Sequence, residues 1–118
     1  IVSHATHAQE PEWFATAPVG ATQKALAKAG WQVSDVDLWE VNEAFAVVPM
    51  ALMKELHVPH EKVNVNGGAI AMGHPLGATG AIRSATAIHA LHRHQLRYSM
   101  VTMCVGMGQG AAGIFERV

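Results

Sequence analysis

Three residues that can take part in chemistry follow predicted strands of this chain: Asn42, His74 and Cys104. Histidine transfers protons near neutral pH, and a cysteine beside a histidine can act as base or nucleophile. Asparagine can donate a hydrogen bond to a water or an oxyanion. Ligands of open α/β sheets bind where strands end, so these residues predict one shared site. The alternative is a solvated His74 and a Cys104 buried as an ordinary apolar side chain.

The segment around His74 is rich in glycine. Five glycines fall within the fourteen residues from Gly67 to Gly80. Glycine admits positive φ and lets a ligand or another backbone approach closely, and Pro75 restricts His74 to extended conformations. We therefore expect the imidazole on a stiff turn between a strand and a helix. A glycine-rich turn with a solvated histidine remains the alternative reading.

The elements that must position these residues follow from hydrophobic periodicity. The pattern predicts strands over 1–6, 36–41, 62–66, 98–104 and 111–116, and helices over 17–29, 45–56 and 78–91. Pro49 lies inside the second helical pattern, so that helix either kinks there or begins near Val48. The order β-α-β-α-β-α-β-β predicts an α/β fold. We expect a five-stranded mixed sheet, four strands parallel and one antiparallel, with helices on both faces.

Glycines also follow Cys104, in the segment Gly106–Gly110. A dinucleotide-binding loop would need a helix directly after it, and a strand is predicted there instead. The backbone N–H groups after Cys104, that of Gly106 among them, could form an oxyanion pocket. A metal site is not expected, because His4 and His7 would lie on opposite faces of a strand.

Composition narrows the class of protein. The chain has 118 residues, of which 50% are apolar and 14% charged, as expected of one globular domain spanning 1–118. The net charge of −1 without a basic block argues against nucleic-acid binding, and no apolar run reaches the length of a membrane span. The single cysteine suits a reducing compartment such as the cytoplasm. The chain opens directly on Ile1-Val2, which suggests a piece of a longer protein.

Three motifs in order resemble the thiolase family. They are Asn42–Ala46, the stretch Asn64–Gly80 with its Gly-His-Pro, and Cys104–Gly106 followed by Gly108–Gly110. Their order and spacing resemble the C-terminal half of an acetyl-CoA acetyltransferase or 3-ketoacyl-CoA thiolase, over nearly the whole chain. The resemblance implies the fold of one thiolase half, without the N-terminal half and the loop domain that binds most of coenzyme A.

The resemblance also implies a chemistry, the reversible Claisen exchange between coenzyme A thioesters, with these thioesters as substrates and no cofactor. His74 matches the histidine that activates the acyl-accepting cysteine and donates to the thioester oxygen. Cys104 matches the cysteine that moves the proton on the α-carbon, for which a thiol of low pKa near an imidazole is expected. Asn42 matches the residue that holds a water in the first oxyanion hole, and the Gly106 N–H matches a donor of the second.

Substrate contacts are implied as well. Ala44, Phe45 and Phe14 match positions near the acyl and pantetheine end of the substrate. His74 and the Cys104 sulfur should then lie within hydrogen-bond or one-water reach, with Asn42 opening onto the same cleft.

Two departures from the family pattern stand out. The acyl-accepting cysteine has no candidate in this chain, so the isolated chain should be inactive and the N-terminal half of the parent is an expected partner. An arginine commonly follows Gly-Ala after the histidine motif, whereas here Ile82 occupies that place and Arg83 comes one residue later. We also expect a homo-oligomer. In the parent, the apolar helix predicted over 78–91 should be buried between the two halves, and in the isolated chain it should be exposed or buried in a dimer or larger species.

Two other readings stay open. The chain could be a non-catalytic assembly or binding domain derived from a thiolase. It could also belong to a related condensing enzyme such as a ketoacyl synthase. Such enzymes usually pair two histidines with their cysteine, and Asn42 argues against that reading.

Overall fold

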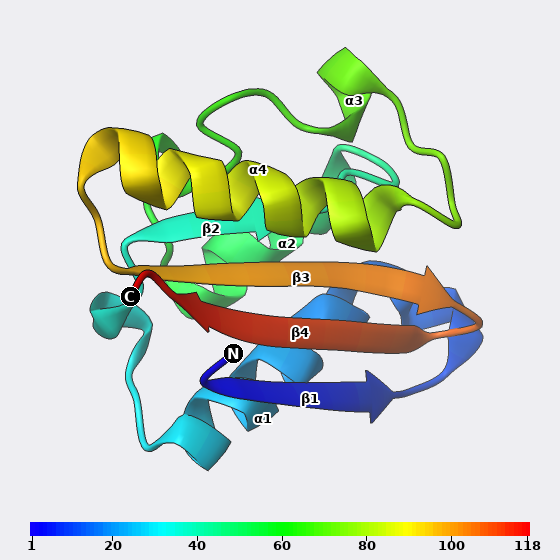
Figure 1. Ribbon diagram of the computed structural model, residues 1–118. Coiled ribbons are helices and arrows are strands. Elements are labelled where there is room, and N and C mark those ends of the chain that lie inside the picture. The colour runs from blue at the N-terminus through cyan, green and yellow to red at the C-terminus, as the bar shows by residue number, and fades with distance from the viewer.

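The structure is a computed structural model that describes residues 1–118. A mixed sheet runs through the molecule, with helices against its two faces (Figure 1). In chain order the elements are β1 (Ser3–Ala8), a 3₁₀ helix (Pro11–Thr16), α1 (Ala17–Ala29), a 3₁₀ turn (Val33–Asp35), β2 (Leu38–Val41), α2 (Val47–Leu56), a 3₁₀ turn (His60–Lys62), α3 (Ala69–Met72), α4 (Thr79–His94), β3 (Tyr98–Gly106) and β4 (Gln109–Glu116).

The sheet has four strands in the order β1-β4-β3-β2. Strands β2 and β3 are parallel, and β4 is antiparallel to both β3 and β1. The prediction of an α/β fold with a mixed sheet is confirmed, but the prediction of five strands is wrong. The segment 62–66 contributes only one parallel bridge, between Val63 and Trp39.

A side chain takes the place of that fifth strand. Asn64 has a φ of 50°, which turns the backbone out of the extended conformation. Its side-chain Oδ1 accepts from the Val41 N–H at 2.8 Å, and its Nδ2 donates to the Val41 carbonyl at 2.9 Å. The side-chain amide thus pairs both backbone groups of Val41, and the Asn64 backbone N–H donates to the Trp39 carbonyl at 2.8 Å, so these groups of β2 are satisfied without a ladder.

Helices α1 and α2 pack on one face of the sheet and α4 on the other, as predicted. The larger core cluster lies on the α1 and α2 face and includes Trp39, Val41 and Leu52. A smaller cluster joins Leu38 of β2 to α4. Helix α4 lies over β2 and β3, while the same face of β4 and β1 carries no helix (Figure 1).

The helix boundaries follow the local signals. Helix α1 has Pro18 in its first turn and ends at Gly30, whose φ of 73° is the left-handed cap that glycine favours. Helix α2 begins at Val47, so Pro49 lies in its first turn and no kink is needed. The 3₁₀ helix over Pro11–Thr16 and the short α3 occupy segments predicted as loop and turn.

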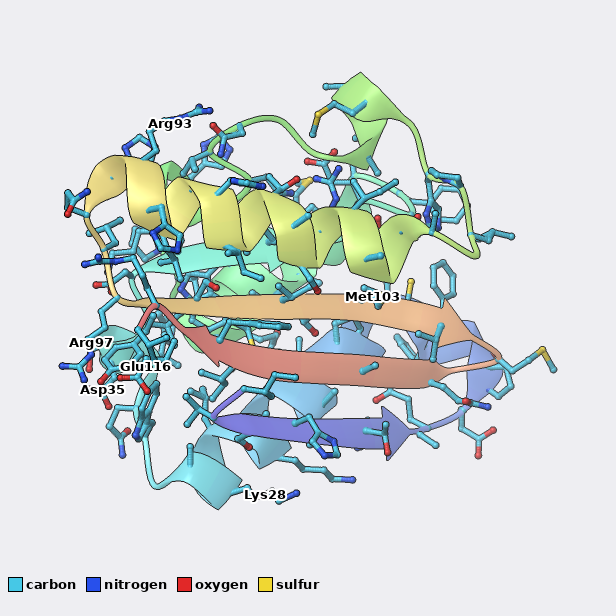
Figure 2. The ribbon with its side chains drawn as sticks, in the orientation of Figure 1. Lys28, Asp35, Arg93, Arg97, Met103 and Glu116 are labelled. Carbon is cyan, nitrogen blue, oxygen red and sulfur yellow. The ribbon has the colours of Figure 1, made fainter.

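The two ends of the sheet differ in character. At one end Arg97 and Glu116 form an exposed ion pair at 2.7 Å, while Met103 lies near the opposite end of β3 (Figure 2). Since β2 and β3 point the same way, both reach their carboxyl ends on the Met103 side. The predicted site residues are therefore placed at this edge.

Strand β2 buries a charge. Its alternating side chains direct Trp39 and Val41 to the larger core, and Leu38 and Glu40 to α4. Glu40 is only 2% exposed and accepts a hydrogen bond from Arg83 at 3.1 Å. Burial raises the pKa of the Glu40 carboxyl to about 7, although the Arg83 guanidinium opposes the shift and Glu43 adds to it.

The raised pKa of Glu40 makes stability depend on pH. Between its ordinary pKa of 4.5 and about 7, the folded chain binds a proton that the unfolded chain has released. The Glu40 contribution to the free energy of unfolding is therefore complete below pH 4.5 and is lost as pH rises to about 7. Denaturant unfolding should show the wild-type chain losing on the order of 3 kcal/mol relative to Glu40→Gln across this window. A difference that stayed constant with pH would contradict the assignment.

Candidate active site

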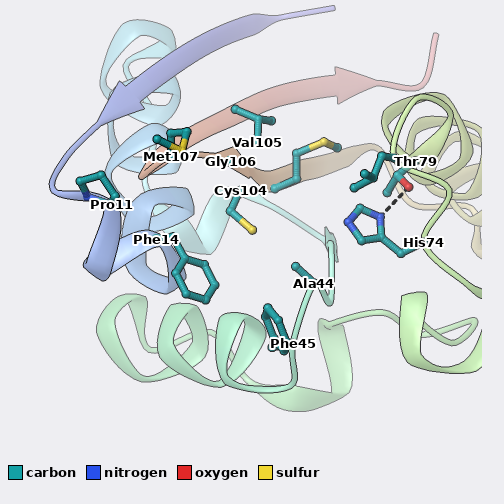
Figure 3. Close-up of a pocket in the computed structure, with 12 residues that line it drawn as sticks. Pro11, Phe14, Ala44, Phe45, His74, Thr79, Cys104, Val105, Gly106 and Met107 are labelled. Carbon is teal, nitrogen blue, oxygen red and sulfur yellow. Dashed lines mark hydrogen bonds between the residues drawn. The ribbon is translucent and has the colours of Figure 1, made fainter.

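A pocket of about 660 Å³ opens at the carboxyl ends of β2 and β3 (Figure 3). Segments far apart in the sequence form its wall: the 3₁₀ helix before α1, the loop after β2, the His74 turn, and the β3–β4 hairpin. The lining residues are Pro11, Phe14, Ala44, Phe45, His74, Leu76, Thr79, Met103, Cys104, Val105, Gly106 and Met107. The wall is mostly apolar, with the imidazole and the thiol as its reactive groups.

The structure brings the sequence-predicted site residues together. Six of them line this pocket: Phe14, Ala44, Phe45, His74, Cys104 and Gly106. The seventh, Asn42, is fully buried behind the wall and reaches the His74 ring. The side chains of His74 and Cys104 face the same cavity from different walls, and no hydrogen bond joins them directly (Figure 3).

Thr79 sets the tautomer of His74. The Thr79 hydroxyl donates to the Pro75 carbonyl at 2.9 Å, so we assign its oxygen as the acceptor of the His74 Nδ1–H at 2.7 Å. In this assignment neutral His74 carries its proton on Nδ1, and the lone pair lies on Nε2. Because Thr79 is the first residue of α4 and only 2% exposed, the ring is fixed to the start of that helix.

Asn42 meets the other ring nitrogen of His74. Its Nδ2 lies 3.3 Å from His74 Nε2 and donates to the lone pair that Thr79 leaves there. Its Oδ1 is buried and has no partner. Since a buried amide oxygen without a partner is uncommon, this atom is free to accept a hydrogen bond from a bound water or ligand. Asn42 can therefore hold a polar group next to the imidazole.

Cys104 does not have the lowered pKa that its chemistry suggested. The thiol is half-buried, and burial raises its pKa above the ordinary 9.0, with a backbone hydrogen bond opposing the shift. The hydrogen bonds of the His74 ring go to Thr79 and Asn42, and none joins it to the thiol. The prediction of a low-pKa thiol is wrong for this chain, and Cys104 rests as a protonated group that can donate.

The hairpin after Cys104 brings its backbone to the pocket. Gly106, Met107 and Gly108 all have positive φ, and the strand register shifts between Cys104 and Gly106. Gly108 packs so closely on the carbonyl of Gln9 that no Cβ would fit. The turn therefore needs glycine, and it places the Gly106 backbone beside the thiol in the pocket.

An aromatic pair narrows the apolar end of the pocket. Phe14 and Phe45 meet edge to face, with ring centroids 5.8 Å apart and planes at 61°. Phe14 comes from the 3₁₀ helix before α1, whereas Phe45 lies in the loop before α2 and is 62% exposed. From the sequence, only the family resemblance linked these two residues to the substrate. The structure places both of them in the pocket wall.

Sequence reasoning missed the residues that hold this site in place. Thr79 fixes the ring of His74, and Glu43 accepts from both Ile70 N–H at 2.8 Å and Asn64 Nδ2 at 3.0 Å. Thr79 had a recognisable signal, because a threonine at a helix start five residues after a histidine can meet its ring. The contacts of Glu43 had none, because they join segments that only the fold brings together.

The raised pKa of Cys104 predicts slow alkylation. Only the thiolate reacts with iodoacetamide, so the rate in the folded chain should reach half its maximum above pH 9.0, later than in the denaturant-unfolded chain. Mass spectrometry can follow the reaction without ambiguity because the chain has one cysteine, and Cys104→Ser gives the background. A folded-chain midpoint below that of the unfolded chain would show that the thiol is activated.

Comparisons with known proteins find a family that matches nearly the whole chain. The family model described as "Thiolase, C-terminal domain" matches residues 1–117. Beta-ketothiolase BktB of Cupriavidus necator is 50% identical over 118 residues, which are 100% of this chain and 30% of that protein.

Solved structures agree with this match. The Bacillus anthracis acetyl-CoA acetyltransferase is similar with a TM-score of 0.97 at 41% identity, covering 100% of this chain and 30% of that one. Human mitochondrial 3-ketoacyl-CoA thiolase has a TM-score of 0.97 at 42% identity, with the same coverage. The fold and site thus define one half of a thiolase-type α/β protein. The chain belongs to the thiolase C-terminal domain family.

The match leaves most of the relatives uncovered, since the chain spans about 30% of their length. The remaining 70% of such a protein has no counterpart here.

None of the helices combines the length and apolar character needed to cross a bilayer.

Proposed function

We propose that the full-length protein is an acyl-CoA C-acyltransferase that catalyses the reversible Claisen condensation and thiolysis of coenzyme A thioesters. One observation supports this most: Thr79 and Asn42 hold His74 with its Nε2 at a pocket that also contains Cys104 and the Gly106 backbone. A base, a second proton carrier and oxyanion donors in one cavity are what acyl transfer followed by α-proton removal requires.

The first half-reaction begins at His74. Its Nε2 accepts the proton of an acyl-accepting cysteine, which the uncovered part of the protein would supply. The resulting thiolate attacks the thioester carbonyl, and the bond to the coenzyme A sulfur breaks as the acyl group moves to the cysteine. Cys104, resting protonated, gives its proton to the departing thiolate and becomes a thiolate itself.

The second half-reaction uses the thiolate left on Cys104. It removes an α-proton from acetyl-CoA, and the carbanion attacks the acyl-cysteine carbonyl. The bond between that carbonyl carbon and the cysteine sulfur then breaks and releases a 3-ketoacyl-CoA, and the departing cysteine thiolate takes back the proton held on His74 Nε2. The α-proton is a weak acid, so the enolate oxygen needs stabilisation by about 3–4 kcal/mol per donor. The protonated Nε2 of His74 and a water held by Asn42 suit this oxygen. The Gly106 N–H suits the oxyanion that forms on the acyl group.

The pocket wall bears on the substrate. Ala44, Phe45 and Phe14 would contact the acyl and pantetheine portion, because they line the apolar side of the cavity. The group transferred arrives on coenzyme A, so the reaction as proposed needs no separate cofactor. A reducing compartment such as the cytoplasm would keep Cys104 as a free thiol.

Helix α4 offers a surface for the rest of the protein or for a second copy. It buries Arg83, Ala87 and Leu91 against the sheet, while Ile82 and Ile88 remain 37% and 41% exposed on its outer side. These two side chains lie about 120° apart around the helix and border its outer surface, which we call the α4 surface. Exposed apolar groups on both borders suit an interface. We propose that the N-terminal part of the parent covers the α4 surface, and that the parent is a homo-oligomer.

Activity is the direct test of the proposed function. The full-length protein should cleave acetoacetyl-CoA with coenzyme A, whereas the 118-residue chain alone should not exceed background, because it lacks the acyl-accepting cysteine. Loss of the acetoacetyl-CoA absorbance measures the rate. In the full-length protein His74→Ala should lower kcat by a factor of about 100 or more. Full activity without His74 would overturn the assignment, and full-length protein without any turnover would favour a binding or assembly domain.

The α4 surface gives a separate prediction. The isolated chain should self-associate at high concentration through the α4 surface, and light scattering should report a dimer or larger species. Ile82→Lys with Ile88→Lys places one charge on each border of that surface and should restore a monomer. A matched pair of substitutions at exposed Lys24 and Lys28 of α1, each to Glu, should leave the association unchanged. A wild-type chain that stays monomeric would count against α4 as the covered helix.

A further inference from the structure

A buried ion pair lies behind the pocket and takes no part in its wall. Arg83 of α4 and Glu40 of β2 are 1% and 2% exposed, and Arg83 Nη1 lies 3.1 Å from Glu40 Oε2. Neither residue lines the cavity that holds His74 and Cys104. A role in contacting substrate is therefore excluded for both, and their effect must pass through other residues.

The guanidinium of Arg83 joins three segments. Its Nη1 also donates to the Gly67 carbonyl at 3.1 Å, and Gly67 has a φ of 87° at the start of the glycine-rich turn that leads to His74. Glu40 lies in β2, two residues before Asn42, which follows the last residue of that strand. One side chain thus ties together the segment that ends in Asn42, the turn that carries His74, and the helix α4.

The hydrogen bonding of Arg83 is incomplete. Its Nε and Nη2 are buried and have no partner, so two of its three nitrogens are desolvated without compensation. Replacing a buried ion pair by apolar side chains of similar volume is often neutral or stabilising. An apolar side chain at this position would contribute more to stability than Arg83 does. The presence of Arg83 is therefore better explained by how it positions the segments that it joins.

The place of Arg83 along α4 matters as well. Successive helical residues are rotated by about 100°, so neighbours cannot share a contact. Ile82 occupies the outer side of α4 and is 37% exposed, whereas Arg83 points into the sheet. An arginine at position 82 would lie on the outer surface and could not reach Glu40.

We propose that Arg83 is a positioning residue. By binding Glu40 and the Gly67 carbonyl together, it holds the turn that carries His74 against β2, the strand that directly precedes Asn42. The spacing between the Asn42 amide and His74 Nε2 depends on this attachment. The proposal rests on the proposed function only for its catalytic consequence, since the spacing itself can be measured in the 118-residue chain.

Removing both charges separates positioning from stability. The double variant Glu40→Leu/Arg83→Met has no unpaired buried charge and should fold with a melting temperature at or above that of the wild type. In its NMR spectrum the nuclear Overhauser effect between the Asn42 side-chain amide and the His74 ring should weaken or disappear. Arg83→Lys keeps one charge near Glu40 and should retain part of that signal.

Two matched controls separate the ion pair from helix packing and from amino-acid composition. Leu91→Ala removes packing between α4 and β2 without touching the ion pair, so it should lower the melting temperature and leave the Asn42–His74 signal intact. Ile82→Arg/Arg83→Ile keeps the composition and shifts the arginine by one place. It should lose the signal as the double variant does, because the guanidinium then lies on the outer side of α4.

The full-length protein shows the catalytic consequence. The double variant should lower kcat about 10- to 100-fold, as a small misplacement of a catalytic group does, with KM changed by less than about twofold because Arg83 is remote from substrate. A folded double variant that keeps the Overhauser effect and wild-type kcat would overturn the proposal, as would Leu91→Ala producing the same loss. If the wild-type protein shows no turnover, the proposed function fails, and the Overhauser effect alone decides whether Arg83 positions His74.

Discussion

The site depends on one hydroxyl proton. Thr79 directs it to the Pro75 carbonyl, so the threonine oxygen can only accept from His74 Nδ1. That single constraint leaves the lone pair of His74 on Nε2, on the side where the Asn42 amide meets the ring. An imidazole fixed in this way can take up a proton from an incoming thiol that replaces the Asn42 amide at Nε2, without a change of tautomer.

The surrounding structure places this constraint at the edge of the sheet. Parallel strands β2 and β3 end side by side, which brings the Asn42 and Cys104 segments together. The turn between them is attached to β2 by side chains rather than by a strand ladder: Asn64 binds both backbone groups of Val41, and Arg83 binds the Gly67 carbonyl. The glycine-rich turn is thus held from its first residues, although few of its own backbone groups enter regular structure.

The sequence was sufficient to predict the α/β class, the three long helices, and four of the five strands proposed. Asn42 and Cys104 could be placed together because they lie at the ends of two predicted strands, and strand ends of one direction share an edge. His74 was placed there by a predicted strand over 62–66 that the structure reduces to one bridge. Where the chain departs from those predictions, side chains decide the outcome. Asn64 replaces the backbone of a fifth strand, and burial of Cys104 raises a thiol pKa that its motif suggested would be low.

The role of Arg83 shows a different limit. In the sequence, Arg83 comes one residue later than the arginine of the family pattern. Nothing in the sequence indicates which side of that helix faces the sheet. Because of helical rotation, position 82 lies on the outer side of α4, whereas position 83 is buried and pairs with Glu40. Periodicity cannot reveal such a pair, because a charged residue within an apolar helix is ordinarily assigned to the solvent side.

The central claim concerns where a proton lies on His74, and neutron diffraction from a deuterium-exchanged crystal at a pH where the imidazole is neutral measures it directly. We predict nuclear density for deuterium on Nδ1, directed at Thr79 Oγ1, and none on Nε2. The Asn42 amide nitrogen, with its deuterium atoms, should face Nε2. Deuterium on Nε2 with the Asn42 oxygen as its acceptor would contradict the claim, because the imidazole would then have no lone pair to accept a thiol proton.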